Sequence, residues 1–282
     1  MSLFPKGIFY GFLFFVFICK PHDCNCLAQT SQINWFWGTG LTFFDYKELL
    51  VLPKKSQERG WIPYIGMEYQ ELYPLNHIKL SQLIQMGYGK TLYDGSRMNS
   101  VTNEVSPLTG QTTHVFLNLE TTFAFQLQHH AAMWEPYMGM GYHFWNRRLE
   151  GNVPFYEKYT WLCFPLGLRF QVMITPSLVW GGDFSFRPVA FGTMNLDRTL
   201  YGISSDIVFQ LGNKAGWKAA FPIAWQQNFF ILSITPWYAY SAIGESDRKR
   251  SVSGGLLGSV ELVEPESSTH QYGVWIQFVL SH

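Results

Sequence analysis

The end of the chain alternates strictly between two kinds of side chain. Large apolar residues take every second position from Tyr272 to Leu280, and Gly273, Trp275 and Gln277 are among the residues between them. A period of two gives a β-strand two different faces. A chain that begins with an export signal and ends in such a strand is most economically explained as a transmembrane β-barrel.

The first 28 residues have the features of a secretory signal peptide. Lys6 supplies a positive charge, residues 8–19 form an apolar stretch, and Cys26-Leu27-Ala28 precede the expected cleavage site. The apolar stretch is shorter than the roughly 20 residues of a membrane-spanning helix. A lipoprotein signal is the alternative, but bulky residues stand before Cys19. Cleavage after Ala28 leaves Cys163 as the one cysteine, which excludes an intrachain disulfide.

The composition is unusual for a water-soluble protein. Aromatic residues make up 18% of the chain and charged residues only 14%, against about a quarter in typical soluble domains. Tryptophan and tyrosine favour membrane interfaces, where a ring is half in water. The net charge is zero and no long basic tract occurs, so we expect no nucleic-acid partner.

Alternation divides the mature chain, from residue 29 onward, into about ten strands of an antiparallel, up-and-down barrel. Each segment is close to the 9–11 residues that cross a bilayer as a tilted strand, or somewhat longer. An even number places both termini on the periplasmic side. Residues 200–211 leave a twelve-stranded barrel open as an alternative. The ten segments are 35–44, 61–70, 78–88, 115–127, 133–145, 160–172, 178–187, 217–225, 230–240 and 272–280.

The connectors between these segments alternate between long and short. Outer-membrane barrels have long outer loops and short periplasmic turns. We therefore predict five long extracellular loops, at 45–60, 92–113, 146–159, 188–216 and 241–271, the last with mobile stretches at 253–255 and 264–268. Proline cannot donate to a strand ladder, so we expect bulges or strongly tilted positions at Pro63, Pro136, Pro165, Pro222 and Pro236.

One face of each strand suits lipid and the other a polar lumen. On the strand from Val115, leucine and phenylalanine alternate with Asn118, Glu120 and Gln126. The same phase places four acids and four bases inside the barrel, and we expect them to pair because a lone buried ion is costly. This polar lumen network, the candidate lining of a pore, is Glu68, Lys79, Glu120, Glu135, Arg169, Asp183, Arg187 and Lys218.

No catalytic, cofactor or metal site is indicated by a motif. The omptin proteases are similar in strand number and length, but they use acidic pairs and an Asp-His couple, and neither Asp-x-Asp nor Asp-x-His occurs here. The His-x-Ser motif of lipid A deacylase barrels is also missing. His114 and His143 are the candidates for catalysis through contacts made only in the fold. Scattered histidines lack metal-ligand spacing, and no phosphate-binding loop occurs.

With these patterns, the chain resembles the small outer-membrane β-barrel proteins of diderm bacteria, the group that includes the opacity-type surface antigens. The resemblance implies an outer-membrane location, with outer-membrane lipid and the barrel-assembly machinery as partners. The leading hypothesis is a non-enzymatic protein that binds an extracellular ligand or an envelope protein through its outer loops. The alternatives are a narrow pore for small solutes and a barrel-embedded hydrolase of lipid or peptide.

A closed barrel predicts heat-modifiable migration on a gel. The outer-membrane fraction run on a semi-native gel should show a compact, fast band that shifts on boiling, because the closed strand ladder resists detergent until heated. A soluble periplasmic protein without such a shift would instead show that the apolar faces bury the core of a β-sandwich.

Overall fold

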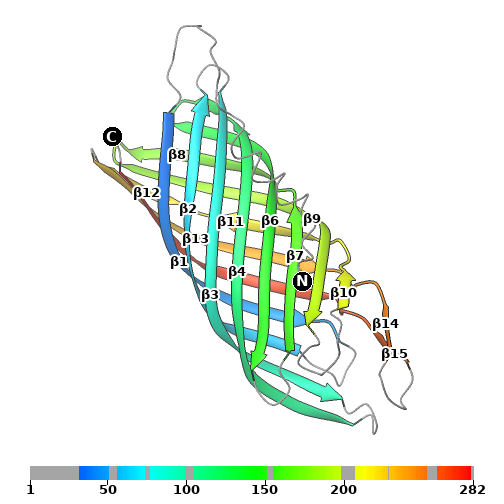
Figure 1. The fold of residues 1–282 in the computed structure, drawn as a ribbon. Helices are drawn as coiled ribbons and strands as arrows, with labels where there is room; N and C mark the ends of the chain where they lie inside the picture. Colours follow the sequence, from blue (N-terminus) through cyan, green and yellow to red (C-terminus); the bar gives the residue numbers. More distant parts are fainter. Residues whose placement is uncertain are drawn as a thin grey trace. The chain divides into compact units, whose positions relative to one another are not determined.

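The computed structural model describes residues 32–50, 56–73, 77–98, 104–150, 155–197, 207–227, 229–252 and 259–280. The predicted signal peptide lies outside these residues. All regular elements in them are strands, shown in Figure 1: β1 (Gln32–Glu48), β2 (Ser56–Tyr73), β3 (Ile78–Met98), β4 (Val105–Phe125), β5 (Leu127–His129), β6 (Ala132–Glu150), β7 (Phe155–Cys163), β8 (Leu166–Thr175), β9 (Leu178–Asp197), β10 (Ile207–Gln210), β11 (Ala215–Ala220), β12 (Ile223–Gln227), β13 (Phe230–Ile243), β14 (Lys249–Val252), β15 (Ser259–Leu262) and β16 (Ser267–Leu280).

The strands of the main sheet form a closed antiparallel ring. β1 pairs with β2 on one side and with β16 on the other, from Trp37 opposite Phe278 to Glu48 opposite Ser267. β7 and β8 pair with the same two neighbours, β6 and β9, and are halves of one barrel strand; β11 and β12 are related in the same way, and β5 continues β4. Counted in this way, the ring has ten strands, as predicted from the sequence.

Of the residues that left twelve strands open, 200–206 lie outside the described chain and Ile207–Gln210 form β10. This strand pairs with the far end of β9, with Ile207 opposite Leu196 and Gln210 opposite Thr193. A single bridge between Gly212 and Gly244 joins the following segment to the end of β13. β10 thus lengthens the wall between β9 and β13 at one end of the barrel and adds no strand to the ring.

Two ends of the barrel can be distinguished. We call one end the turn end, because it carries the short connections after Tyr73, His129, Thr175 and Gln227. The first residue of β1 and the last residue of β16 also lie at this end. At the loop end, much of each predicted long loop is strand: β3 reaches Met98, β4 begins at Val105, and both run beyond their neighbours in Figure 1. Outside the bilayer the outward side chains are polar, so apolar alternation disappears while the strand continues.

The prolines interrupt the ladder without changing its register. β7 ends before Phe164-Pro165 and β8 resumes after it, both in the same register with β6. A register shift occurs instead between β7 and β9, where Thr160 pairs with Thr193 and Leu162 pairs with Ala190. Phe191 lies between these two partners on β9 and has a φ of 54°. Of the two expectations for these prolines, a bulge is wrong, because a missing N–H removes one hydrogen bond and does not require an extra residue; a strongly tilted position stays a prediction.

A band of large apolar side chains faces outward around the turn-end part of the ring. Ile65, Trp37 and Met138 each have more than 60% of their surface exposed. Soluble monomers rarely expose apolar surface of this extent, and this band suits lipid tails. The cluster of Phe43, Trp61 and Tyr272 lies toward the loop end of it, with ring centroids 5.0–6.4 Å apart. Among the described residues, no helix is long and apolar enough to span a membrane.

Candidate functional site in the lumen

A layer of aromatic side chains fills the lumen on the loop-end side of the apolar band. Phe116 and Trp145 lie opposite each other on the neighbouring strands β4 and β6, and Phe44 reaches them from β1, across the lumen. Their centroids are 5.5–5.7 Å apart, and Trp145 also stacks on Tyr159 at 4.7 Å. All four side chains are at most 5% exposed. This aromatic layer packs like a protein core.

A charged cluster lies directly on the aromatic layer and centres on Arg147. Its guanidinium donates to Glu58 at 2.8 Å, to Glu157 at 2.7 Å and to Glu48 at 3.1 Å. It also lies over the ring of Tyr46, 4.8 Å from the centroid. Arg147 is only 1% exposed, and removing one partner of such a buried pair costs about 3–5 kcal/mol. All four charged residues lie in strands, at positions predicted from the sequence to be in the long loops 45–60 and 146–159.

Glu264 adds a fourth carboxyl to this cluster from the segment between β15 and β16. The Tyr159 hydroxyl lies 2.7 Å from Glu264 Oε1 and 3.0 Å from Glu157 Oε2. One hydroxyl donates one hydrogen, so the second contact requires a protonated carboxyl. Burial raises the pKa of the Glu264 carboxyl well above its ordinary range, and the Glu157 and Glu48 carboxylates raise it further. The expectation that residues 264–268 are mobile is wrong, because buried contacts hold Glu264 and Ser267; residues 253–255 are outside the described chain.

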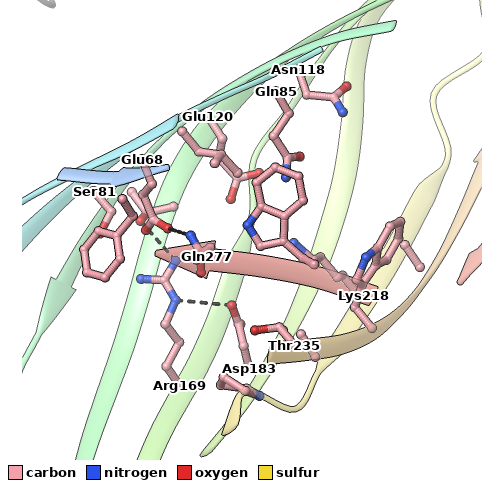
Figure 2. A pocket seen from close by; sticks show the side chains of 18 of the residues that line it. Glu68, Ser81, Gln85, Asn118, Glu120, Arg169, Asp183, Lys218, Thr235 and Gln277 are labelled. Atoms are coloured by element: carbon pink, nitrogen blue, oxygen red, sulfur yellow. Dashed lines mark hydrogen bonds and ion pairs between the residues drawn. The ribbon is translucent and has the colours of Figure 1, made fainter. Parts of the chain in front are cut away.

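Between the aromatic layer and the turn end, the lumen contains a cavity of about 670 Å³, which we call the chamber. Its lining reaches from Phe44, Phe116 and Trp145 at the closed end to Asn34, Gln126 and Gln226 near the turns. Figure 2 shows amides, hydroxyls and charged groups from opposite walls turned toward its centre. In an outer membrane the short turns face the periplasm, so the chamber reaches toward the periplasmic end.

The structure brings the eight predicted lumen residues to this chamber. Seven of them line it, and Glu135 lies behind Lys79 in the wall. Three ion pairs account for six of the eight: Lys79–Glu135 at 2.9 Å, Arg169–Asp183 at 3.2 Å and Arg187–Glu120. Their mutual pairing follows from the cost of an isolated charge in a poorly solvated lumen.

The remaining two, Glu68 and Lys218, form no salt bridge within the described chain. Glu68 accepts hydrogen bonds from Gln70 at 2.7 Å and from Gln277 at 3.0 Å. The Lys218 ammonium lies 5.9 Å from the centre of the Trp237 ring. Ser81, also in the chamber wall, is 5% exposed, and its hydroxyl has no hydrogen-bond partner in the described residues. These groups keep polar capacity available to a molecule in the chamber.

The two histidines considered for catalysis have different surroundings. His114 is fully buried on the loop-end side of the chamber, and its Nε2 faces both Thr91 at 2.7 Å and Glu58 at 3.1 Å. It is sealed among Phe44, Phe116 and Trp145, so no substrate reaches it. His143 lines the chamber and contacts Asn118 and Cys163. No sequence pattern indicates this contact, because it depends on the register between strands.

No metal site is indicated either. The described residues include no group of three or more histidine, cysteine, aspartate or glutamate side chains placed to hold a metal ion.

Comparison with known proteins identifies the fold. No family model matches the chain, and no curated protein matches it by sequence. The crystal structure of the outer membrane protease OmpT from Escherichia coli is similar over 93% of this chain and 99% of its own, with a TM-score of 0.60 and 8% identity. Weaker likenesses include the translocator domain of the autotransporter NalP from Neisseria meningitidis (88% and 89% covered, TM-score 0.42, 8% identity).

These likenesses concern the fold. The likeness to OmpT, together with the closed ring and the lipid-facing band, shows that the chain is built as an outer-membrane β-barrel. At 8% identity, the protease activity of the first protein says nothing about the chemistry of this one.

The raised pKa of the Glu264 carboxyl predicts a pH-dependent loop end. A carboxyl with a higher pKa in the folded state than in the unfolded chain, where it is about 4.3, stabilises the fold fully below that unfolded value. This contribution is lost as the pH rises through the folded pKa. The unfolding temperature in detergent should therefore fall with rising pH in the wild type, and fall less in Glu264→Gln. Glu266→Gln, which alters a surface pair with Lys214, is the matched control; equal pH profiles for all three proteins would contradict the assignment.

Proposed function

We propose that this outer-membrane barrel admits a small polar solute into its chamber from the periplasmic end and is closed to passage at the outer end. The observation that carries this proposal is the division of one lumen into two parts. A cavity of about 670 Å³, lined by both polar and apolar side chains, ends against an aromatic layer of buried side chains. Small-molecule sites are usually preformed cavities of this size range, with a few well-placed polar groups.

The chemistry of the wall favours a polar organic solute. Gln85, Asn118 and Thr235 present amides and a hydroxyl to the chamber (Figure 2). Trp161, Trp237 and Trp275 add flat apolar surfaces to the same lining, and such rings pack against the carbon skeleton of a ligand. Lys218 and Glu68, the two charges outside the ion pairs, are available to a charged substituent.

The narrow pore is less well supported. A steady pore needs a continuous water-filled path, whereas Phe44, Phe116 and Trp145 cross the lumen in contact with one another. The charges proposed as pore lining are on one side of this layer, where they line a chamber closed at its far end. Catalysis through His114 is likewise unsupported, because that side chain is wholly buried.

Cysteine labelling tests the proposed chamber. In a Cys163→Ser background, Thr235→Cys places a thiol in the chamber wall, and Thr112→Cys places one in the buried cluster beyond the aromatic layer. Both positions face inward and the substitutions are nearly isosteric. A small charged methanethiosulfonate reagent added to the folded barrel should modify Thr235→Cys at least roughly tenfold faster, because water reaches only the chamber.

Planar-bilayer recording of the wild-type barrel completes this test, with no steady ionic current expected. Equal labelling of the two cysteines, or a steady current that changes when Glu120 or Arg169 is neutralised, would favour the pore and end the proposal of a closed chamber.

Recognition through the loop end is a second candidate function. It is favoured by the β14–β15 hairpin, which pairs only with itself, in a sheet separate from the barrel. A ligand-binding element on a rigid scaffold is a common arrangement. An extracellular ligand or an envelope protein remains the proposed partner, beside outer-membrane lipid and the assembly machinery.

The removable part of this hairpin stops before Leu262, because Leu262 packs against the hydrophobic core cluster. Replacing residues 249–261 by a short glycine-serine linker leaves Leu262 in place, and also Glu264 with its backbone contact to Ser246 at 3.0 Å. This variant should keep a heat-modifiable band with an unchanged unfolding temperature. Deleting Glu245–Ser268 removes the buried Ser246, Glu264 and Ser267 as well, and should lower that temperature. A matching decrease in both variants would show that the hairpin is part of the barrel core.

A further inference from the structure

Three polar side chains form a line across neighbouring strands of the chamber wall. Asn118 of β4 is directly opposite His143 of β6. Cys163 of β7 is opposite Gly141, the inward-facing position of β6 that precedes His143 by two residues. His143 Nδ1 is 2.7 Å from Asn118 Oδ1, and His143 Nε2 is 3.3 Å from Cys163 Sγ. All three residues line the chamber.

The hydrogen bond to Asn118 fixes the proton on the imidazole. An amide oxygen can only accept, so Nδ1 must carry the hydrogen and donate it. The neutral ring then has its lone pair on Nε2, the atom that faces the thiol. An imidazole in this state can accept the proton of Cys163, and the resulting thiolate is the nucleophilic form of cysteine.

The surroundings hold this geometry and place one cation, the Arg187 guanidinium that also pairs with Glu120, beside the sulfur. Trp161 stacks on the imidazole, with ring centroids 5.3 Å apart and an angle of 17° between the planes. A Cβ at position 141 would lie only 2.8 Å from Sγ, so glycine there makes room for the thiol beside the imidazole. The Arg187 guanidinium lies 3.7 Å from Sγ and supplies a positive charge next to it.

We propose that Cys163 is a nucleophile and His143 its general base, with Asn118 as a positioning residue, and that they hydrolyse small carboxylic esters in the chamber. The proposal rests on the proposed function, because the ester must enter the chamber. Cys163 is only 2% exposed, so the reacting acyl group must be small. Cys163 is the one cysteine in the described residues, so there is no second thiol to close a redox cycle, whereas an acyl cycle needs only water.

The reaction balances with the groups present and water. Nε2 of His143 takes the thiol proton as Sγ bonds to the ester carbonyl carbon, and the carbonyl oxygen becomes an oxyanion near Arg187. The intermediate expels the alkoxide, which takes the proton from Nε2, and leaves a thioester on Cys163. Water then gives a proton to Nε2 and attacks the thioester. The acid is released, and the proton returns from Nε2 to sulfur.

The test uses p-nitrophenyl acetate with the folded, detergent-solubilised barrel. We expect a burst of p-nitrophenolate close to one equivalent per barrel, and an acetyl group on Cys163 by peptide mass spectrometry. Cys163→Ser should abolish both. His143→Ala should slow acetylation by roughly 100-fold or more, the usual contribution of a general base. Each variant must retain heat-modifiable migration, so that loss of folding is not mistaken for loss of chemistry.

Asn118 needs a readout that separates positioning from packing. Asn118→Leu removes the acceptor for Nδ1–H and should slow acetylation, whereas Asn118→Asp retains an acceptor and should restore most of the rate. Equal rates in the two variants would show that Asn118 only fills space.

Methyl methanethiosulfonate, a small neutral thiol reagent, separates the two proposals. If it modifies Cys163 in the folded barrel but p-nitrophenyl acetate does not, the chamber is open and the nucleophile proposal is overturned. If neither reagent reacts until the chain is denatured, access to the chamber fails, and both proposals fall. Acetylation that persists unchanged in His143→Ala would also overturn the assigned base.

Discussion

The closing pair of strands, β1 and β16, is the contact on which the rest of the structure depends. A strand edge in hydrocarbon would leave backbone N–H and C=O groups without partners, at a cost of several kcal/mol each. The ladder from Trp37–Phe278 to Glu48–Ser267 removes that edge. Closure also forces every second side chain into the lumen. The interior therefore has to be filled or hydrated, and the chain does both.

The two halves of the lumen solve this problem differently. On the loop-end side, aromatic rings pack densely, and Arg147 is surrounded by carboxylates. On the turn-end side, three ion pairs and several amides line a chamber. Outer-membrane barrels of about this size are wide enough for side chains to fill and leave little free space. The aromatic layer thus separates the charged cluster around Arg147 from the chamber.

The pairing register between strands brings residues that are far apart in the sequence into one site. Asn118, His143 and Cys163 are widely spaced in the sequence, yet adjacent strands bring them into hydrogen-bonding distance. The same geometry brings Glu58, Arg147 and Glu264 together at the loop end. A one-residue slip of any strand would turn these side chains to the opposite face, so the closed ladder holds the buried cluster and the chamber wall in place together.

The sequence by itself determined the number of ring strands, the outward apolar face and the eight inward charges, because a period of two and a lipid-facing preference are local properties that each strand displays alone. It did not reveal how far the strands continue, since Glu58, Arg147 and Glu157 are outside the lipid-facing band and carry no apolar alternation. Only the tertiary structure decided that these residues close the lumen and that His143 contacts Cys163. Both outcomes depend on register and ring closure, which are set by pairing between strands far apart in the chain.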